Sequence, residues 1–464
     1  MAAYLKRLDL DDRLDSLKVI HIAGTKGKGS TAAFVESMLR HSGYSTGLFT
    51  SPHLMDVRER IRINGQLVGE DVFLRNFWEC FQNFQDESKP DSPGMPAYFR
   101  FLTLLGFKIF LEQGVDVVVL EVGLGGRLDA TNCVRRPVVC GVASLGFDHM
   151  DVLGHTLPEI AREKAGIFKQ GVPAFTVPQP AEAMEQLERT AAEVGAPLAL
   201  TPPLEAYTAG SAPTLGLPGA HQRVNAALAV ALARAFEEQE SEQGDGSGAE
   251  QAAARVKELA QGRLPSSYLT GLEAARWPGR AQVVEDPETP AEPGSPPRLT
   301  FFLDGAHTAE SMTACAEWFA DCALAPEEGE VQNLLVFNCQ PERSPEALLE
   351  PVVSVLDRRA VALRRAFFAP PDSMVGKLGK RQGPAELTWQ RQLQGTWEQL
   401  CKKQSATKAP ALCPESAVLP SLKSVLDSCR KSVRDSPNLR LRVLVTGSLY
   451  IVGDMLSLLG VRIS

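Results

Sequence analysis

The stretch KVIHIAGTKGKGST, residues 18–31, decides the fold, because it joins an apolar run to a glycine-rich turn and the start of a helix. Lys18–Ala23 predicts a buried strand, and Ser30–His41 predicts the helix that follows it. Glycines in the turn allow several backbone N–H groups to point at one phosphate, and the helix adds its positive N-terminal end. Lys28 adds a full positive charge for the β- and γ-phosphates.

This turn departs from the standard phosphate-loop pattern GxxxxGK[ST]. Ile22 stands where the first glycine belongs, and Gly29 separates Lys28 from Ser30. An ordinary glycine-rich turn after a strand is the alternative interpretation. The flanking strand and helix, the central lysine and a hydroxyl from Ser30 or Thr31 favour nucleotide binding instead.

Apolar runs alternate with helical patterns along much of the chain. The runs are continuous and rich in valine, as parallel strands covered on both faces require. In the first half they are Thr46–Thr50, Val115–Val122, Pro137–Leu145 and Val172–Val177, and in the second half Leu299–Leu303, Asn333–Phe337, Arg365–Phe368 and Leu441–Thr446. This pattern predicts an α/β fold in which a doubly wound, mostly parallel sheet is followed by a smaller α/β unit.

Residues 1–278 and 279–464 are the expected domains, with the boundary near Trp277–Gly279. Three stretches interrupt the pattern. An acidic, turn-rich surface loop is expected at 237–251, a flexible proline-rich insertion between two strands at 286–297, and a polar stretch with weak periodicity at 370–416.

Composition excludes several classes of protein. A formal charge of −8 argues against a nucleic-acid partner, whose binding usually leaves a basic footprint. Nine scattered cysteines without a CxxC pair argue for reduced, buried thiols. The first 18 residues resemble neither a secretory signal nor a transit peptide, and no apolar run approaches the ~20 residues of a membrane span. A cytoplasmic protein is expected, with a mitochondrial or plastid isoform left open.

Polar residues follow three of the predicted strands, where ligands bind in open α/β sheets. Ser51, Glu121 and His149 are candidate Mg²⁺ ligands there. Taken singly, each has a plainer interpretation: Ser51 as a turn residue, Glu121 as the partner of an arginine and His149 as a loop histidine. Because all three are expected at the same edge of the sheet as the phosphate loop, the metal-binding interpretation is favoured. Lys164 lies on a helix that a Thr156–Glu159 capping box opens, and its pattern alone predicts a solvated lysine.

The second set of strands ends in the same way. Asp304 and His307 follow one strand, Asn338 a second and Ser448 a third, while Arg280 lies at the expected hinge. These groups are expected on one edge, where they would complete a cleft between the domains.

Ten ordered motifs carry a family resemblance: GTKGKGST, TSPHL, RERIRING, EVGLGGRLDATN, LGFDHMDVLGHT, EKAGIFK, HQRVNAALA, WPGR, DGAHT and VTGSLY. In this order they resemble the folylpolyglutamate synthases of the Mur ligase superfamily, from about Tyr4 onward. The resemblance implies a P-loop ATPase domain joined to a smaller Rossmann-like domain. It also implies addition of L-glutamate, by a γ-peptide bond, to a tetrahydrofolate polyglutamate through an acyl phosphate.

The resemblance further implies roles for individual residues. The phosphates of ATP would be bound by Gly27, Lys28, Gly29 and Ser30, and ATP would also be contacted across the domain interface by Asn225, Arg280 and Asp304. Mg²⁺ would be held by Ser51, Glu121 and His149, and a second Mg²⁺ by a carbamylated Lys164. The incoming glutamate would be placed by His307 and Ser448. Two Mg²⁺ ions and a monovalent cation are the implied metals. Lys28, Lys164 and His307 are the implied catalytic residues. The implied partners are small molecules alone, and the implied state is a monomer.

The acceptor side of the site resembles the eukaryotic synthases. Arg58, Tyr98, Phe99 and Arg100 are the implied folate contacts, and related dihydrofolate synthases commonly carry an acidic residue where Arg100 stands. This favours the polyglutamylating enzyme over dihydrofolate synthase, which joins glutamate to dihydropteroate. A P-loop nucleotide switch is the distant alternative, which DGAHT and VTGSLY fit poorly.

Overall fold

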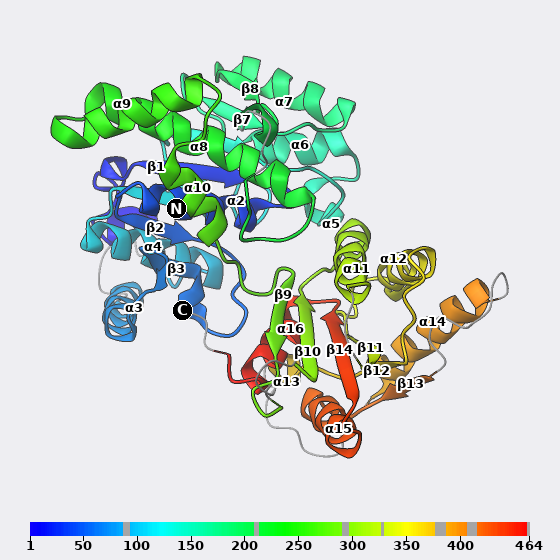
Figure 1. The fold of residues 1–464 in the computed structure, drawn as a ribbon. Coiled ribbons are helices and arrows are strands. Elements are labelled where there is room, and N and C mark those ends of the chain that lie inside the picture. The colour runs from blue at the N-terminus through cyan, green and yellow to red at the C-terminus, as the bar shows by residue number, and fades with distance from the viewer. Residues whose placement is uncertain are drawn as a thin grey trace. The chain divides into compact units, whose positions relative to one another are not determined.

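The computed structural model describes residues 1–86, 93–207, 213–289, 297–325, 329–375, 387–405 and 415–461. It divides into two compact units, Met1–Trp277 and Pro278–Ile463, each an α/β structure (Figure 1). No helix in these ranges is both long and apolar enough to span a membrane.

In the described part of the first unit, eight strands form one sheet in the order β4-β3-β2-β5-β1-β6-β7-β8. Their bounds are β1 Val19–Ala23, β2 Thr46–Phe49, β3 Ile61–Ile63, β4 Gln66–Leu67, β5 Val117–Glu121, β6 Val139–Val142, β7 Ala174–Thr176 and β8 Leu198–Leu200. Only the β2–β3 and β3–β4 pairs are antiparallel. After β1 the chain turns to one side of the sheet, and from β6 onward it extends the other side, so the loop after β1 lies at the topological switch point.

Helices cover both faces of this sheet. They are α1 Ala2–Arg7, η1 Leu14–Ser16, α2 Lys28–His41, η2 Val57–Arg60, α3 Glu70–Gln85, α4 Tyr98–Gln113, η3 Ala130–Cys133, α5 Met150–Leu153, α6 Leu157–Ala165, α7 Ala181–Val194, η4 Leu204–Tyr207, α8 His221–Gln243, α9 Gly246–Ala260 and α10 Ser266–Ala274. Val117 and Val119 of β5 pack among α2 and α8, whereas Val118 and Leu120 pack among α3 and α4. The continuous apolar run is thereby explained, since both faces of the strand are buried.

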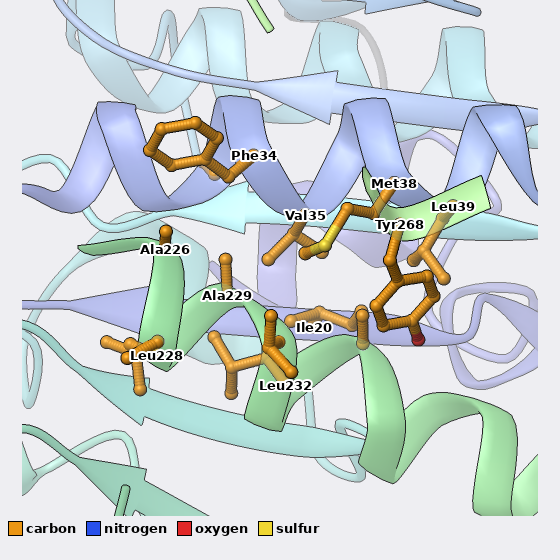
Figure 2. Packing of buried hydrophobic residues seen from close by; sticks show 14 of the residues in the cluster. Ile20, Phe34, Val35, Met38, Leu39, Ala226, Leu228, Ala229, Leu232 and Tyr268 are labelled. Carbon is orange, nitrogen blue, oxygen red and sulfur yellow. The ribbon is translucent and has the colours of Figure 1, made fainter. Parts of the chain in front are cut away.

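Figure 2 shows the packing over β1. Val35 and Met38 of α2 point toward Ala229 and Leu232 of α8, and these side chains belong to one buried cluster. Small alanines on α8 allow the two helices to approach closely above the sheet. This packing holds the N-terminal ends of both helices firmly at the edge where β1 ends.

The second unit contains a six-stranded sheet within the described ranges, in the order β13-β12-β11-β14-β10-β9. Its elements are β9 Gln282–Glu285, β10 Leu299–Asp304, α11 Ala309–Ala323, β11 Glu330–Phe337, α12 Pro345–Arg358, β12 Arg365–Phe368, α13 Asp372–Val375, α14 Thr388–Ser405, β13 Glu415–Val418, α15 Leu422–Asp435, β14 Leu439–Thr446 and α16 Leu449–Leu458. All pairs are parallel except β9–β10. The predicted α/β fold with two largely parallel sheets is confirmed.

The prediction of a surface loop at 237–251 is wrong. Helix α8 continues to Gln243 and α9 begins at Gly246. Glu237 is fully buried in α8, where Arg255 of α9 approaches it to 2.5 Å and the hydroxyl of Tyr268 donates to it at 3.1 Å. Acidic composition suggested solvent exposure, but a buried ion pair and a hydrogen bond compensate this carboxylate.

Two other interruptions are partly described. Stretch 286–297 lies between β9 and β10, as expected, while residues 290–296 fall outside the described ranges. Within 370–416, helices α13 and α14 and the start of β13 replace the expected irregular polar stretch; residues 376–386 and 406–414 are not described. Helix α14 packs its buried Leu393 and Trp397 against the second core, a contact that weak periodicity does not predict.

Candidate functional site

The phosphate-loop candidate connects β1 to α2. Helix α2 begins at Lys28, two residues earlier than the sequence predicted, because Gly27 takes a left-handed conformation (φ 84°) and turns the chain directly into the helix. The N–H groups of Thr25 and Lys26 both donate to the carbonyl of Ser144 at 3.0 Å. The loop is therefore fixed to the segment after β6, and no side-chain hydrogen bond caps the N-terminus of α2 in the described structure.

Ser30 and Thr31, in the first turn of α2, have hydroxyl groups in different environments. Ser30 is buried, and its Oγ accepts a 3.4 Å hydrogen bond from Gln222. The Oγ1 of Thr31 is buried with no hydrogen-bond partner among the described residues. The Nζ of Lys28 lies 3.5 Å from the carbonyl of Thr25, so the ammonium group lies beside the loop.

Helix α8 brings two amide side chains to the same turn. A Cβ on Gly27 would lie 2.1 Å from Oδ1 of Asn225, so glycine is required where these segments meet. Asn225 donates to Oε1 of Gln222 at 2.9 Å, and Gln222 in turn contacts Ser30. The prediction did not include Gln222, although its place three residues before Asn225 puts both on one helix face.

The first two metal-ligand candidates lie together at the carboxyl edge of the sheet. Glu121 ends β5, which pairs in parallel with both β1 and β2. The backbone N–H of Ser51, just after β2, donates to Oε2 of Glu121 at 3.0 Å. Glu121 is only 4% exposed, so a largely buried carboxylate stands one strand away from the phosphate loop.

His149 lies farther along the same edge. It follows β6 and caps α5 with a left-handed backbone (φ 50°). Its backbone N–H donates to Oδ1 of Asp148 at 2.9 Å, and its ring Nε2 is 3.8 Å from Oδ2. Thr25 holds this segment through Gly146, because its hydroxyl donates to the carbonyl at 3.1 Å and accepts from the N–H at 3.2 Å.

Lys164 contradicts the solvated lysine that the local pattern predicts. The predicted Thr156–Glu159 capping box is confirmed, but Lys164 on this helix is 4% exposed, and its Nζ donates to the carbonyl of Gly24 at 2.8 Å. Burial lowers the pKa of Lys164 to about 7, and the nearby charge of Lys28 acts in the same direction. Tertiary packing thus places a second amine beside the phosphate loop.

The donor groups at this edge suit a hard cation in part. The described residues contain no group of three or more His, Cys, Asp and Glu side chains that would hold a metal ion. Mg²⁺ usually takes only one or two carboxylates from a protein and fills its octahedron with phosphate and water oxygens. A single carboxylate, Glu121, beside the hydroxyl-bearing Ser51 therefore fits Mg²⁺ that arrives with a nucleotide.

The carboxyl edge of the second sheet collects the other candidates. Asp304 ends β10, and its carboxylate accepts from the N–H groups of Ala281 at 2.7 Å and Ala306 at 2.9 Å. Arg280 lies close by, since a Cβ on Gly305 would come within 2.7 Å of its Nη1. Asp304 thereby fixes the backbone around Arg280.

His307 and Ser448 lie at two neighbouring helix starts on this edge, because β10 and β14 are paired in parallel. The Nδ1 of His307 is 2.8 Å from the carbonyl of Gly305, a contact in which the nitrogen acts as donor and holds the ring. Ser448 caps α16, where its Oγ accepts from the N–H of Ile451 at 3.4 Å. Asn338, buried after β11, accepts from Gln390 at 3.0 Å.

The four acceptor-side candidates are in different environments. Arg58 forms an ion pair with Asp56 at 2.7 Å, and this carboxylate raises the pKa of Arg58. Tyr98 is 59% exposed, with the guanidinium of Arg60 5.7 Å from its ring centre. Phe99 touches Gly123, where a Cβ would lie 2.4 Å from its ring, and Arg100 is exposed.

Arg60 was not predicted, although it lies two residues from Arg58 in the same motif. It is 8% exposed, and its Nε donates to Nδ1 of His53 at 2.9 Å. This contact joins the TSPHL and RERIRING segments beneath Tyr98. The available signal was the second arginine of the RERIRING motif, two residues after Arg58.

Comparisons with known proteins agree with this architecture. Residues 22–194 match the Mur ligase middle domain. The chain is 43% identical to a folylpolyglutamate synthase of Arabidopsis thaliana over 99% of this chain and 81% of that protein. It is 46% identical to the mitochondrial folylpolyglutamate synthase of Homo sapiens, over 75% of this chain and 59% of that one.

Solved structures show the same fold. Mycobacterium tuberculosis folylpolyglutamate synthase, complexed with ADP and AMPPCP, superposes with a TM-score of 0.73 at 24% identity, covering 100% of this chain and 95% of that one. Escherichia coli FolC, in complex with DHPP and ADP, superposes with a TM-score of 0.68 at 27% identity, covering 99% and 94%. With an identity of 43% across nearly its whole length, this chain belongs to the folylpolyglutamate synthase family.

Proposed function

We propose that this chain is an ATP-dependent ligase that adds L-glutamate, by a γ-linkage, to tetrahydrofolyl-(poly)glutamate and releases ADP and phosphate. One observation carries the proposal. This chain, which is 43% identical to a folylpolyglutamate synthase, brings together at a single sheet edge an uncapped helix start, Lys28, buried Glu121 and buried Lys164. That combination suits the transfer of a phosphoryl group to a carboxylate.

The phosphate loop performs the first half of this reaction. A carboxylate is a poor electrophile, so one of its oxygens first attacks the γ-phosphorus of ATP and ADP leaves. Phosphoryl transfer depends mainly on alignment and charge neutralisation. Gly27, Lys28, Gly29 and Ser30 hold the phosphates through backbone N–H groups, one ammonium and one hydroxyl, while Asn225 supports the turn from α8. The uncapped start of α2 and the orphaned hydroxyl of Thr31 support this assignment.

Magnesium belongs to the same edge in this proposal. Ser51, Glu121, His149 and Lys164 would hold up to two ions, which neutralise phosphate charge and orient the acceptor carboxylate. A cationic lysine cannot bind a metal, but a neutral amine can add CO₂ and lose a proton to become an anionic carbamate. The pKa of about 7 keeps a substantial share of Lys164 neutral near physiological pH, which supports this chemistry.

The second unit supplies the remaining groups. We assign Arg280 and Asp304 to ATP, and His307 and Ser448 to the incoming glutamate. The free amine of that glutamate attacks the acyl carbon, and phosphate leaves with its bonding electrons. His307 and Ser448 lie at two neighbouring helix starts, where their side chains would bind the carboxylates of glutamate, and this placement supports the assignment. Because acyl phosphates hydrolyse, catalysis needs a conformation that excludes water.

On the acceptor side, we assign Arg58, Tyr98, Phe99 and Arg100 to the folate. Tyr98 offers an exposed ring for stacking, and exposed Arg100 offers a charge for the glutamate tail. Arg58 already pairs with Asp56, so its contribution requires that pair to open or to act as a unit.

Product analysis tests the proposal. Purified protein is incubated with ATP, MgCl₂, L-glutamate and tetrahydrofolate monoglutamate, and the products are identified by mass spectrometry. Folates lengthened by γ-linked glutamate, with one ADP for each bond, are expected. In a parallel reaction, dihydropteroate replaces the folate. If glutamate is added to dihydropteroate and not to tetrahydrofolate, the protein is a dihydrofolate synthase instead. ADP release that does not depend on acceptor and glutamate indicates a nucleotide switch.

We also propose a monomer in the cytoplasm. Relatives from cattle and humans are named mitochondrial, so a mitochondrial location is the alternative. Light scattering of the purified protein and fractionation of cells that express the tagged native gene test the two points. A dimer mass, or a signal confined to mitochondria, contradicts them.

A further inference from the structure

Asn132, in the motif LDATN, connects two segments of the candidate site. Its side-chain Nδ2 donates to the carbonyl of Arg127 at 3.0 Å and to the carbonyl of Gly166 at 3.0 Å. Arg127 belongs to the glycine-rich loop after β5, and Gly166 directly follows α6. One amide group therefore bridges two backbone segments that lie far apart in the sequence.

The two backbones are already in close contact at this point. The N–H of Arg127 donates to the carbonyl of Glu163 at 2.8 Å. A Cβ on Gly126 would lie 2.7 Å from the carbonyl oxygen of Glu163, and a Cβ on Gly166 would lie 2.5 Å from Cα of Arg127. Both glycines are needed for this approach, so the contact between loop and helix leaves little freedom for adjustment.

Lys169 fixes the orientation of the bridging amide. Its Nζ donates to Oδ1 of Asn132 at 2.8 Å. An ammonium group can only donate, so the oxygen of Asn132 must face Lys169 and the nitrogen must face the two carbonyls. Rotation of the amide would leave two carbonyls and an ammonium without this partner. Lys169 thereby selects the one orientation in which Asn132 connects the loop to the helix.

The bridge lies between two candidate metal ligands. Glu121 is the residue from which the loop starts, six positions before Arg127, and Lys164 lies two positions before Gly166. We propose that Asn132 and Lys169 are positioning residues that set the distance between Glu121 and Lys164 for Mg²⁺. The inference rests on the proposed function, because it assigns a role toward the metal of that same site. Neither residue touches the substrates in this proposal.

Mg²⁺ titration of variants tests the role. In Asn132→Ala, the Mg²⁺ concentration for half-maximal ligation is expected to rise roughly 10- to 100-fold, the usual range for partners that orient metal ligands. kcat is expected to fall, while the KM for glutamate stays within about twofold. Lys169→Met keeps both Asn132 donors and is expected to show a smaller shift in the same direction. Asn83→Ala, which removes a hydrogen bond between α3 and Arg7, is the matched control and is expected to leave the Mg²⁺ dependence unchanged.

A second measurement separates this inference from the proposed function. Calorimetry of AMPPCP binding at several Mg²⁺ concentrations needs no turnover, and Asn132→Ala is expected to weaken its Mg²⁺-dependent part. If the parent binds Mg²⁺-nucleotide but forms no glutamylated folate, the proposed function fails while the positioning role is still judged by calorimetry. Equal Mg²⁺ dependence in parent and Asn132→Ala, even with a lower melting temperature, overturns the positioning role. If Asn132→Ala does not fold, Lys169→Met decides by the same criterion.

Discussion

The carboxyl edges of the two sheets differ in how their helices begin. In the first unit, α2 follows Gly27 and has no side-chain cap within the described structure. In the second unit, Thr308 caps α11 by accepting from the N–H of Ser311, and Ser448 caps α16 by accepting from the N–H of Ile451. The edge with α2 thus leaves backbone N–H donors for a ligand. At the edge with α11 and α16, side-chain caps already accept hydrogen bonds from some of these donors.

This difference indicates two kinds of recognition. The first turn of a helix has N–H groups without intrahelical partners, and an anion can take the place of a cap. We therefore propose that the edge with α2 binds phosphates through backbone N–H groups and Lys28. We propose that the edge with α11 and α16 binds its ligand through side chains instead. Variants at the two edges should consequently change different measured quantities.

The largest effect is expected from removing the charge beside the uncapped helix. Lys28→Ala should lower the rate of ligation by at least about 1000-fold, or about 4 kcal/mol of transition-state stabilisation, because no other ammonium in this edge replaces it in our assignment. Acceptor-dependent ADP formation and mass spectrometry of products measure it. Lys257→Ala, on the exposed side of α9, is the control. Ligation by Lys28→Ala at the parent rate would contradict the assigned site.

Lys164 should give the protein a distinctive dependence of stability on pH. Its folded-state pKa of about 7 lies below the usual 10.5, so between these values the unfolded chain holds a proton that the folded chain lacks. Stability of the parent relative to Lys164→Met should therefore rise from pH 7 to 10, by a few kcal/mol, since each pKa unit is worth about 1.4 kcal/mol.

Urea unfolding of the ligand-free proteins in CO₂-free buffers measures this difference. Lys423→Met, at an exposed position, provides the comparison. A constant difference between parent and Lys164→Met across this range would show that Lys164 is not buried as an amine.

Gly27→Ala should weaken nucleotide binding about tenfold or more. The new Cβ meets Oδ1 of Asn225 at 2.1 Å, and alanine disfavours a φ of 84°, so the start of α2 must move. Gly43→Ala is a matched control, because Gly43 also has a positive φ (96°) but nothing lies within 4 Å of the new Cβ. Calorimetry with AMPPCP compares the two, and equal affinities would argue against a phosphate loop at Gly27.

The smallest effect is expected at the capped edge. Ser448→Ala and Thr308→Ala should each cost about 1 kcal/mol of stability, or a few degrees of melting temperature, through loss of a helix cap. Only Ser448→Ala should also raise the KM for glutamate, and neither should change nucleotide affinity. Differential scanning calorimetry and steady-state kinetics measure these effects. A nucleotide-affinity change in Thr308→Ala would remove the distinction between the edges.

Long-range contacts explain where sequence patterns predicted the fold and where they did not. Central strands such as β5 were predictable, because burial on both faces demands the continuous apolar run 117–120. Helix α9 was not, since its docking depends on Arg255 reaching a buried Glu237 in another helix. Helix α14 likewise shows its buried face only once the second core is assembled.

The sequence by itself determined the central strands, the glycine turn at Gly27, and therefore which residues follow those strands, because these depend on local backbone preferences and on apolar periodicity. Only the tertiary structure decided that Lys164, an ordinary lysine in its helix, is buried against the carbonyl of Gly24. It also decided that Asn132 and Lys169 join the loop after β5 to the end of α6. Such contacts depend on the packing of distant segments, and that packing changes both the dielectric around an amine and the partners of an amide.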